Sequence, residues 1–332
     1  MHSSLKNLIL ILLPVTAFLF SFAIGRYAVS IPQLMSTLYG HYFGGVMETN
    51  LETVVFNIRL PRIFAAMLVG AALSTAGAAY QGMFKNPLVS PDILGASAGA
   101  GFGACLAIYL SQSGLIIQIS AFLFGLAAVF LAYLINVKLD YDPILGLVLG
   151  GILISTLFSS GTGVLKYFAD ANDKLPAITF WLMGSLSSVD KRDLLMVLIP
   201  MSIGFTSLFL VRWRLNVLAF GEEEARSLGI NTKRLRLIVI ISSTLVTAAS
   251  VSICGMVGWI GLVIPHLARA IVGPNYSILM PVTFIIGATY LLLIDDVARC
   301  LGSVEVPLGI LTSLIGVPFF IFIFKKNVRG WK

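Results

Sequence analysis

The sequence has 332 residues, of which 58% are hydrophobic and only 11% are charged, and its formal net charge is +7. Ordinary soluble domains carry about 25% charged residues, so this composition excludes a soluble protein and indicates an integral membrane protein. Positive charge in such a protein is explained by loops that face anionic lipid, which argues against nucleic-acid binding. The three cysteines lack the spacing of disulfide or metal sites and are expected to be packing residues.

Apolar segments follow one another along the chain with short polar connections between them. A bilayer core about 30 Å thick needs roughly 20 apolar residues per helical crossing. Long apolar runs without strand alternation favour helices over a barrel. We therefore predict an all-α integral membrane protein with about ten transmembrane helices, which form a single transmembrane domain over residues 1–332. The expected crossings are 5–25, 60–82, 92–111, 115–137, 144–168, 193–211, 236–256, 258–273, 278–296 and 306–325.

The orientation of the chain follows from its basic residues. The first apolar run is longer than the roughly 7–15 residues of a signal-peptide core, so we interpret it as an uncleaved crossing; the small residues at 28–30 leave cleavage open as the alternative. With the N-terminus inside, the inner connections hold most of the 22 Lys and Arg residues, which predicts that both termini are cytoplasmic. The boundary between the seventh and eighth crossings, within 254–275, is the least sharply defined.

One long polar segment, residues 212–236, interrupts the apolar pattern. Its centre predicts a short helix, because Glu222, Glu223 and Glu224 follow Gly221, and acidic side chains favour a helix N-terminus. Gly229 supplies a C-terminal stop. Two interpretations fit these residues: a solvated loop, or a helix that docks on a soluble partner. The apolar Leu218, Phe220 and Leu228 are then expected to fill a groove on that partner.

A resemblance favours the docking interpretation. Residues 218–229 resemble the coupling loop of FecCD-type permeases, the membrane subunits of ABC importers for iron-siderophores, haem and cobalamin. Further motifs occur in the order found in that family, so the resemblance extends over essentially the whole chain. These motifs are residues 59–62, 82–88, 91–95, 261–269, 295–299, 305–309 and 316–320.

The resemblance implies a type II ABC importer permease bundle in a prokaryotic cytoplasmic (inner) membrane. It implies a homodimer, two cytoplasmic ATPase subunits that bind ATP and Mg, and an extracytoplasmic substrate-binding protein. The sequence has no GxxxxGK[ST] loop for nucleotide phosphates, so ATP hydrolysis is expected in a partner chain. We expect no enzyme activity and no cofactor in this chain. The predicted ATPase-coupling residues are Leu218, Phe220, Gly221, Glu222, Glu223, Glu224, Ala225, Arg226, Leu228 and Gly229.

The resemblance also implies a docking site for the binding protein and a pore. Arg59, Arg62 and Arg299 are expected at the outer surface, where arginines pair bidentately with carboxylates; interfacial snorkelling is the alternative. Residues 175–186 are too short to cross the membrane, and they correspond to a short pore-lining helix with Trp181 and Gly184. An interfacial aromatic anchor is the alternative there. The inner gate is expected near Asp142, Pro143, Ile144 and Leu145.

Other classes of protein fit the sequence less well. An ion-gradient-driven carrier normally buries ionisable residues near the bilayer midplane, whereas the charges here cluster at the ends of the expected crossings. A membrane-embedded enzyme needs an acid/base pair, a nucleophile or a metal, and the sequence shows no such pattern. The three histidines lack metal-ligand spacing. For the substrate, a ferric siderophore is the leading hypothesis, and haem, cobalamin and molybdate or tungstate are the alternatives.

Overall fold

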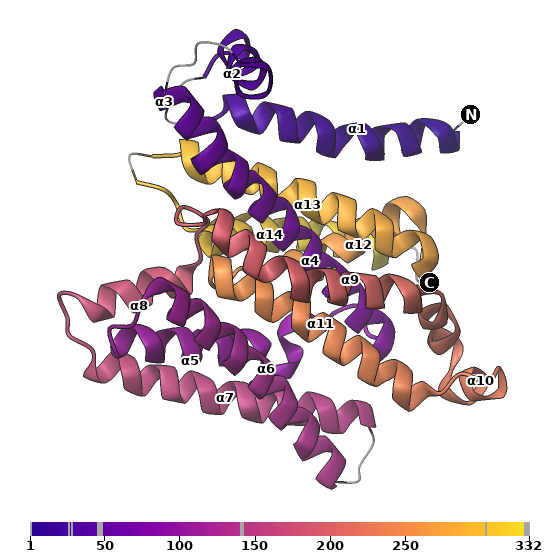
Figure 1. Ribbon diagram of the computed structural model, residues 1–332. Coiled ribbons are helices and arrows are strands. Elements are labelled where there is room, and N and C mark those ends of the chain that lie inside the picture. Colours follow the sequence, from indigo (N-terminus) through magenta and orange to yellow (C-terminus); the bar gives the residue numbers. More distant parts are fainter. Residues whose placement is uncertain are drawn as a thin grey trace.

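The computed structural model describes residues 2–25, 27, 29–44, 49–139, 143–302 and 304–328. Over this part of the chain the structure is all-helical, as the sequence predicts (Figure 1). The first elements along the chain are α1 (His2–Ala23), α2 (Ile31–Phe43), α3 (Thr49–Glu52), the π-helix η1 (Thr53–Arg59), α4 (Leu60–Phe84) and the 3₁₀ helix η2 (Pro91–Leu94). The next group is α5 (Ala96–Tyr109), α6 (Gly114–Leu139), α7 (Pro143–Phe168) and α8 (Lys174–Met183). The last group is α9 (Lys191–Phe220), α10 (Glu222–Ser227), α11 (Thr232–Cys254), α12 (Ile260–Val272), α13 (Tyr276–Cys300) and α14 (Leu308–Val328).

Six helical runs in the described residues are long and apolar enough to cross a membrane. They are Asn50–Phe84, Gly114–Lys138, Ile144–Phe168, Lys191–Phe220, Thr232–Cys254 and Tyr276–Cys300. Four shorter apolar helices accompany them: Leu8–Ala23, Ala96–Tyr109, Ile260–Val272 and Leu308–Phe322. Each expected crossing overlaps one of these ten helices. The multi-pass membrane class is therefore confirmed, while the number of ten crossings stays a prediction.

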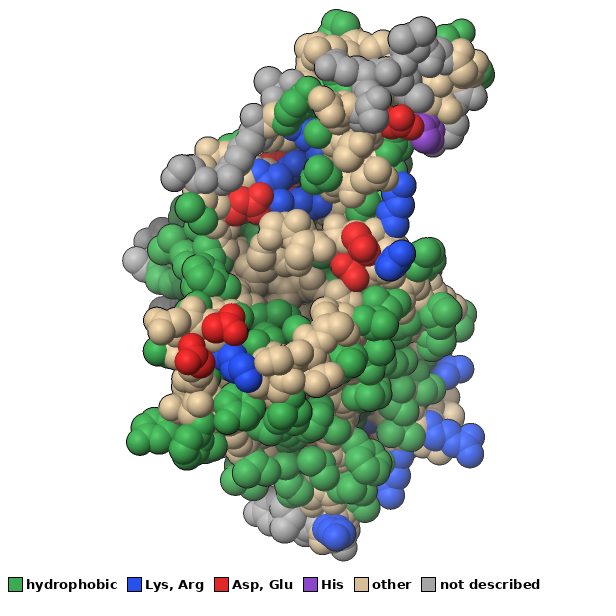
Figure 2. Space-filling model, turned by 60° about the vertical axis from the view of Figure 1, so that its left-hand side comes forward, with side chains coloured by type: hydrophobic (Ala, Val, Ile, Leu, Met, Phe, Trp, Pro, Cys, Tyr) green, Lys and Arg blue, Asp and Glu red, His purple; other side chains and the backbone are tan. Residues whose placement is uncertain are grey.

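Hydrophobic side chains cover broad areas of the molecular surface, as a lipid-exposed protein requires (Figure 2). The centre of the bundle is α4, which is the most buried of the long apolar helices. Its neighbours approach at the level of the backbone: a Cβ on Gly70 would lie 2.2 Å from the carbonyl oxygen of Gly287 in α13. A Cβ on Gly77 would lie 1.9 Å from the carbonyl oxygen of Gly261 in α12. Small residues thus bring three helices into direct contact, which is how helices associate in lipid.

Two parts of the bundle matter for the candidate sites. Figure 1 shows α5, α6, α7 and α8 gathered on one side, with α8 reaching toward the C-terminal end of α11. The boundary between the seventh and eighth crossings is now defined, because α11 ends at Cys254, Gly255 has a φ of 70°, and α12 starts at Ile260. At the opposite end of α11, α10 lies between α9 and α11 as a separate short helix.

Candidate functional site

The first candidate site is the segment Gly221–Asn231, which holds α10. Gly221 connects α9 to α10 with a φ of 156°, and a Cβ at this position would overlap the Glu224 carboxylate at 1.6 Å. The Glu224 side chain is flexible and can move away, but L side chains rarely adopt this φ, so the backbone angle favours glycine where α10 begins directly after α9. The acidic side chains predicted for the first turn, Glu222, Glu223 and Glu224, do occupy it.

The C-terminal end of α10 is fixed by backbone hydrogen bonds. The N–H of Gly229 donates to the carbonyl of Arg226 at 2.9 Å, and the N–H of Ile230 donates to the carbonyl of Ala225 at 2.9 Å. This pair of bonds is a Schellman motif, which needs a left-handed residue after the helix. Gly229 supplies it with a φ of 78°. The predicted stop at Gly229 is therefore a defined cap.

Glu222 joins α10 to the start of α11. Its Oε2 accepts a hydrogen bond from Arg236 at 2.6 Å, and its Oε1 accepts from Thr232 at 3.0 Å and from Arg226 at 2.7 Å. Burial alone would raise the pKa of the Glu222 carboxyl, but the Thr232 and Arg236 hydrogen bonds together with the Arg236 charge outweigh it, so the pKa lies below its ordinary value. The carboxylate therefore stays charged at neutral pH and ties α10 to α11.

The surface that α10 presents is partly apolar. Phe220 is 82% exposed and Leu228 is 69% exposed, while Ala225 is fully buried against the bundle. Leu218 is also fully buried, because α9 continues as a packed helix through this position. The expectation that Leu218 reaches a partner groove is therefore corrected: it anchors α9 internally, and Phe220 and Leu228 are the accessible apolar side chains.

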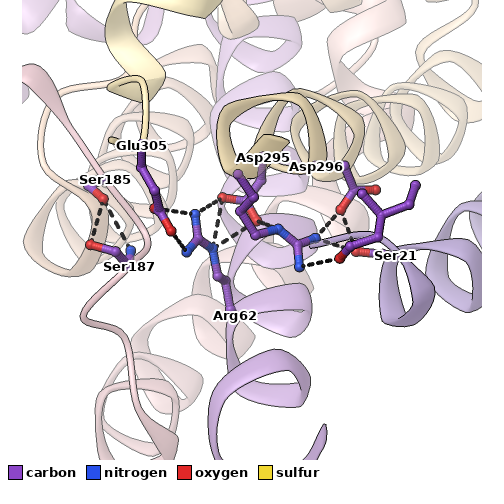
Figure 3. A network of polar contacts seen from close by, with 9 residues as sticks. Ser21, Arg62, Ser185, Ser187, Asp295, Asp296 and Glu305 are labelled. Atoms are coloured by element: carbon purple, nitrogen blue, oxygen red, sulfur yellow. Dashed lines mark hydrogen bonds and ion pairs between the residues drawn. The ribbon is translucent and has the colours of Figure 1, made fainter. Parts of the chain in front are cut away.

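The second candidate site is a cluster of buried charges where α4 meets α13 (Figure 3). The guanidinium of Arg62 donates to the carboxylate of Asp295 through Nε and NH2, the shortest bond being 2.8 Å. It also donates to both carboxylate oxygens of Glu305, at 2.9 and 2.8 Å. Arg62 therefore forms two bidentate pairs, the strongest geometry available to an arginine.

Arg299 extends this cluster along α13. Its guanidinium contacts Asp295 at 3.2 Å and Asp296, and it donates to the hydroxyl of Ser21 in α1 at 2.7 Å. Ser21 in turn donates to Asp296 at 2.6 Å. The neighbouring Arg59 donates to the backbone carbonyls of Phe22 and Tyr27. The cluster ties α1, α4 and α13 together.

The three arginines predicted for docking are thus buried. Arg59, Arg62 and Arg299 are each only 4 to 5% exposed. The expectation of open surface arginines is corrected, because all three side chains are buried and pair with carboxylates, carbonyls or a hydroxyl of the same chain. The residues that sequence reasoning missed are the partners Asp295, Asp296, Glu305 and Ser21. The only available signal was the i, i+4 and i, i+3 spacing of the two aspartates before Arg299.

The third candidate site is a junction of three helix ends at Gly184. Gly184 ends α8 with a φ of 76°, its carbonyl accepts from the N–H of Leu308 at 2.9 Å, and the next N–H donates to the carbonyl of Cys254 at 2.8 Å. A Cβ on Gly255 would lie 2.3 Å from the carbonyl oxygen of Trp181. The ends of α8 and α11 and the start of α14 therefore meet through backbone, and glycine is required for the approach.

An open hollow of about 490 Å³ lies beside this junction. Its lining is apolar apart from one hydroxyl, and no charged side chain contributes to it. Trp181 is half-buried and packs against the buried cluster of Ala100, Ala104, Ala121 and Val251. The lining residues are Leu182, Met183, Met256, Gly258, Gly309, Ile310, Ser313 and Leu314.

The predicted inner gate is described only in part. Asp142 lies outside the described residues. Pro143 is the first residue of α7, Ile144 is half-buried and Leu145 is 44% exposed. The first turn of α7 therefore follows the connection between α6 and α7, as the sequence predicts, but the gate role stays a prediction.

Comparison with known proteins agrees with the fold. The model of the FecCD transport family matches residues 10–326. The molybdate import system permease protein MolB of Haemophilus influenzae is 42% identical over 320 residues, which cover 96% of this chain and 95% of that protein. An iron chelatin transport system permease protein of Helicobacter pylori is 40% identical over 290 residues, which cover 87% of each chain.

A solved structure is similar over nearly its whole length. It is described as an inward-facing conformation of a metal-chelate type ABC transporter, and it superimposes with a TM-score of 0.87 at 40% sequence identity. The match covers 96% of this chain and 97% of that chain. Together with the family match over residues 10–326, this similarity shows that the chain belongs to the FecCD transport family.

Proposed function

We propose that this chain is the membrane permease of a binding-protein-dependent ABC importer that moves a metal-containing solute into the cell. Two copies of the chain, each with ten membrane-crossing helices, form the translocation pathway, and both termini of each copy are cytoplasmic. Separate cytoplasmic subunits hydrolyse ATP with Mg, and an extracytoplasmic protein delivers the solute. The proposal rests on α10, which Glu222 holds to the bundle, and on the exposed apolar side chains that flank it, Phe220 at the end of α9 and Leu228 after α10.

This construction of α10 is suited to transmitting force. The exposed apolar side chains supply the contact with the ATPase, since an apolar patch on a short helix fits a groove on a partner. The Glu222–Arg236 ion pair and the Schellman cap resist bending between α10 and α11. A movement of the ATPase subunits is therefore passed to α9 and α11 as a tilt, and ATP binding shifts the balance between inward-open and outward-open states.

The hollow beside Gly184 supports a weakly binding pathway. Its lining offers apolar surface and the single hydroxyl of Ser313, so it holds no strong ligand for a metal or for a charged solute. A pathway that bound its solute tightly would release it slowly. We propose that the hollow is part of the pore wall and that Gly184 positions α8 within it, while selectivity resides in the delivering protein.

We also propose that the buried arginine cluster supports docking of the binding protein. Glu305 is its most accessible member, with 28% of its side chain exposed, whereas the Arg62 side chain is 7% exposed. A carboxylate of the binding protein can replace Glu305 on Arg62 without leaving a buried charge unpaired. Arg59 pairs with carbonyls rather than with a carboxylate of its own, so it adds positive charge beneath the docking surface.

Arg59 provides a direct test of this docking role. Arg59→Gln is expected to weaken capture of the binding protein at least tenfold, because it removes the positive charge beneath the docking surface that attracts carboxylates of the binding protein. Arg192→Gln is the matched control, since Arg192 is an exposed cation in the first turn of α9. Affinity is measured by surface capture of the purified permease complex. Equal affinities for the two variants contradict the docking role, provided that both proteins elute as the unaltered complex.

For the solute we propose a ferric siderophore, as the family resemblance implies and as the similarity to an iron chelatin permease supports. Molybdate is the second candidate, because the MolB protein is 42% identical over nearly the whole chain. The two solutes differ in size and charge, but the apolar hollow contains no group that selects between them. The distinction must therefore come from the binding protein.

The solute is identified by uptake measurements in cells that lack their other importers. The assay follows ⁵⁵Fe-siderophore uptake with and without the permease gene, in the presence of unlabelled molybdate, tungstate, haem or cobalamin. Permease-dependent iron uptake that only ferric chelates compete with supports the first proposal. Permease-dependent ⁹⁹Mo uptake without iron uptake replaces it with molybdate. Absence of uptake for every solute contradicts the importer function.

A further inference from the structure

The helix α2 has a sequence and a capping pattern of its own, independent of the membrane-crossing helices. Ser30 caps its N-terminus: its hydroxyl accepts from the N–H of Gln33, and the Gln33 side chain accepts from the N–H of Ser30 at 2.9 Å. This reciprocal capping box, with Pro32 in the first turn, starts a helix efficiently. With 13 residues α2 is about 20 Å long, which is too short to cross a bilayer.

One face of α2 packs on the protein. Leu34 and Thr37 are buried, and the ring of His41 stacks on Phe56 of η1 with a centroid distance of 4.0 Å. His41 also bonds the Glu52 carboxylate at 2.9 Å. These contacts attach α2 to the segment that leads into α4.

A second face of α2 is apolar and has no protein partner in the described part of the chain. Ile31, Met35, Tyr39 and Phe43 are 60, 60, 65 and 74% exposed. Residues four apart lie on one side of a helix, so the four form a continuous stripe along α2. The rings of Tyr39 and Phe43 stack at 5.0 Å, which makes one end of the stripe aromatic. Contact of these four side chains with water is unfavourable relative to burial in an apolar environment.

The third face is polar and narrow, with Gln33 and Ser36 exposed. The three faces follow one another around the helix: protein contact, apolar stripe, polar edge. A helix that lies in a membrane surface needs this order, because it touches protein on one side, acyl chains below and water above.

The surroundings of α2 indicate that lipid, rather than a protein partner, covers the apolar stripe. The helix follows α1 after seven residues, and α1 itself exposes apolar side chains, among them Leu12, Val15 and Leu19 at 48, 50 and 53%. Helix α2 lies next to the C-terminal end of α1 (Figure 1), so the exposed apolar side chains of α1 lie on a helix that is its direct neighbour. Helix α2 contains no Asp, Glu, Lys or Arg, so it carries no charge pattern for a protein partner. Tyrosine is typical of the membrane–water interface, and phenylalanine is typical of the apolar face of an interfacial helix.

We propose that α2 is an interfacial helix, which immerses the stripe Ile31, Met35, Tyr39 and Phe43 in the bilayer leaflet at the surface where α1 ends. Lipid contact then holds α2 in the membrane surface. The contacts of His41 with Phe56 and Glu52 hold the segment that leads into η1 next to α2. Because η1 ends at Arg59, the start of α4 is positioned against the membrane surface. This role does not depend on which solute is carried or on how ATP is used.

Spin-label accessibility in vesicles tests the proposal. The exposed native thiol is removed by Cys300→Ser, and the buried Cys105 and Cys254 stay in place. Nitroxide labels are attached to Met35→Cys and, as the matched control, to Ser36→Cys. The full chain is reconstituted in vesicles of phosphatidylethanolamine and phosphatidylglycerol, and the labelled Cys300→Ser protein provides the blank. Accessibility is measured to oxygen, which partitions into lipid, and to a nickel chelate, which stays in water.

The label at position 35 is expected to favour oxygen over the nickel chelate several-fold more than the label at position 36. A nickel accessibility at position 35 equal to that at position 36 places the stripe in water and overturns the proposal. Low accessibility to both reagents at position 35 places the stripe against protein, either a second copy or another subunit, and also overturns it. Tyr39→Cys is the second variant, and it decides the outcome if Met35→Cys does not elute as a folded protein.

Discussion

Replacing Phe220 and Leu228 together with Asp is expected to reduce ATP-driven uptake at least tenfold while leaving membrane insertion unchanged. Both side chains are exposed and do not support the fold, so their replacement changes the surface of α10 rather than its structure. Loss of buried apolar anchors at an interface commonly costs 2 kcal/mol or more, which exceeds a tenfold change in affinity. Uptake and ATP hydrolysis are measured in the same vesicles.

The matched control keeps the apolar surface of α10. Phe220→Leu with Leu228→Met retains apolar volume at both positions and is expected to retain most of the uptake. Glu222, Arg236 and the Schellman cap are untouched in both double variants, so a difference between them reports the contact with the partner. Wild-type uptake by the Asp variant refutes α10 as the point where the ATPase acts.

Replacing Asp295 with Asn is expected to produce the largest loss of stability of any single substitution in the arginine cluster, about 3–5 kcal/mol. The Asp295 side chain is fully buried and contacts both Arg62 and Arg299, whose side chains are only 7 and 6% exposed. Removal of its charge leaves the buried guanidinium groups of Arg62 and Arg299 with one carboxylate fewer to neutralise them. The thermal unfolding midpoint of the purified protein in detergent is the measurement.

Glu305→Gln is the control for this prediction. Glu305 pairs with Arg62 from a more exposed position, so solvent compensates part of the lost charge and the unfolding midpoint is expected to fall by much less. Equal midpoints for Asp295→Asn and Glu305→Gln contradict the account of Asp295 as the centre of the cluster. Binding-protein capture by Glu305→Gln then also reports whether this residue competes with a docking carboxylate.

The membrane-crossing helices could be predicted from the sequence because a helix that crosses lipid needs a long, continuous apolar run, which is a local pattern. A long apolar run is sufficient to identify a crossing, and α10 was predictable for the same kind of reason, through Gly221, three glutamates and Gly229 within nine residues. Helix α2 was missed because its signal is different. Its 13 residues are too few for a crossing and alternate apolar with polar side chains, so hydropathy assigns them to a loop.

The burial of individual side chains could not be predicted in the same way. Arg62 and Asp295 are 233 residues apart, and only the packing of α4 on α13 brings them together. The positions of these arginines at the ends of expected crossings, together with the family resemblance, therefore indicated surface arginines where the structure has buried ion pairs. Leu218 was assigned to an exposed surface because it precedes a polar motif, whereas α9 carries it into the core. Such contacts depend on which helix faces meet, and this information is not local.

The central claim is that ATP hydrolysis on separate subunits, transmitted through α10, drives inward movement of the solute. The most direct measurement is solute uptake by vesicles that contain the permease, its ATPase subunits and its binding protein, with ATP on the α10 side and ionophores that collapse proton and sodium gradients. Uptake is expected to require ATP, to persist with the ionophores and to be lost when Phe220 and Leu228 are changed to Asp. Uptake that proceeds without ATP and stops when the ion gradients collapse would contradict it.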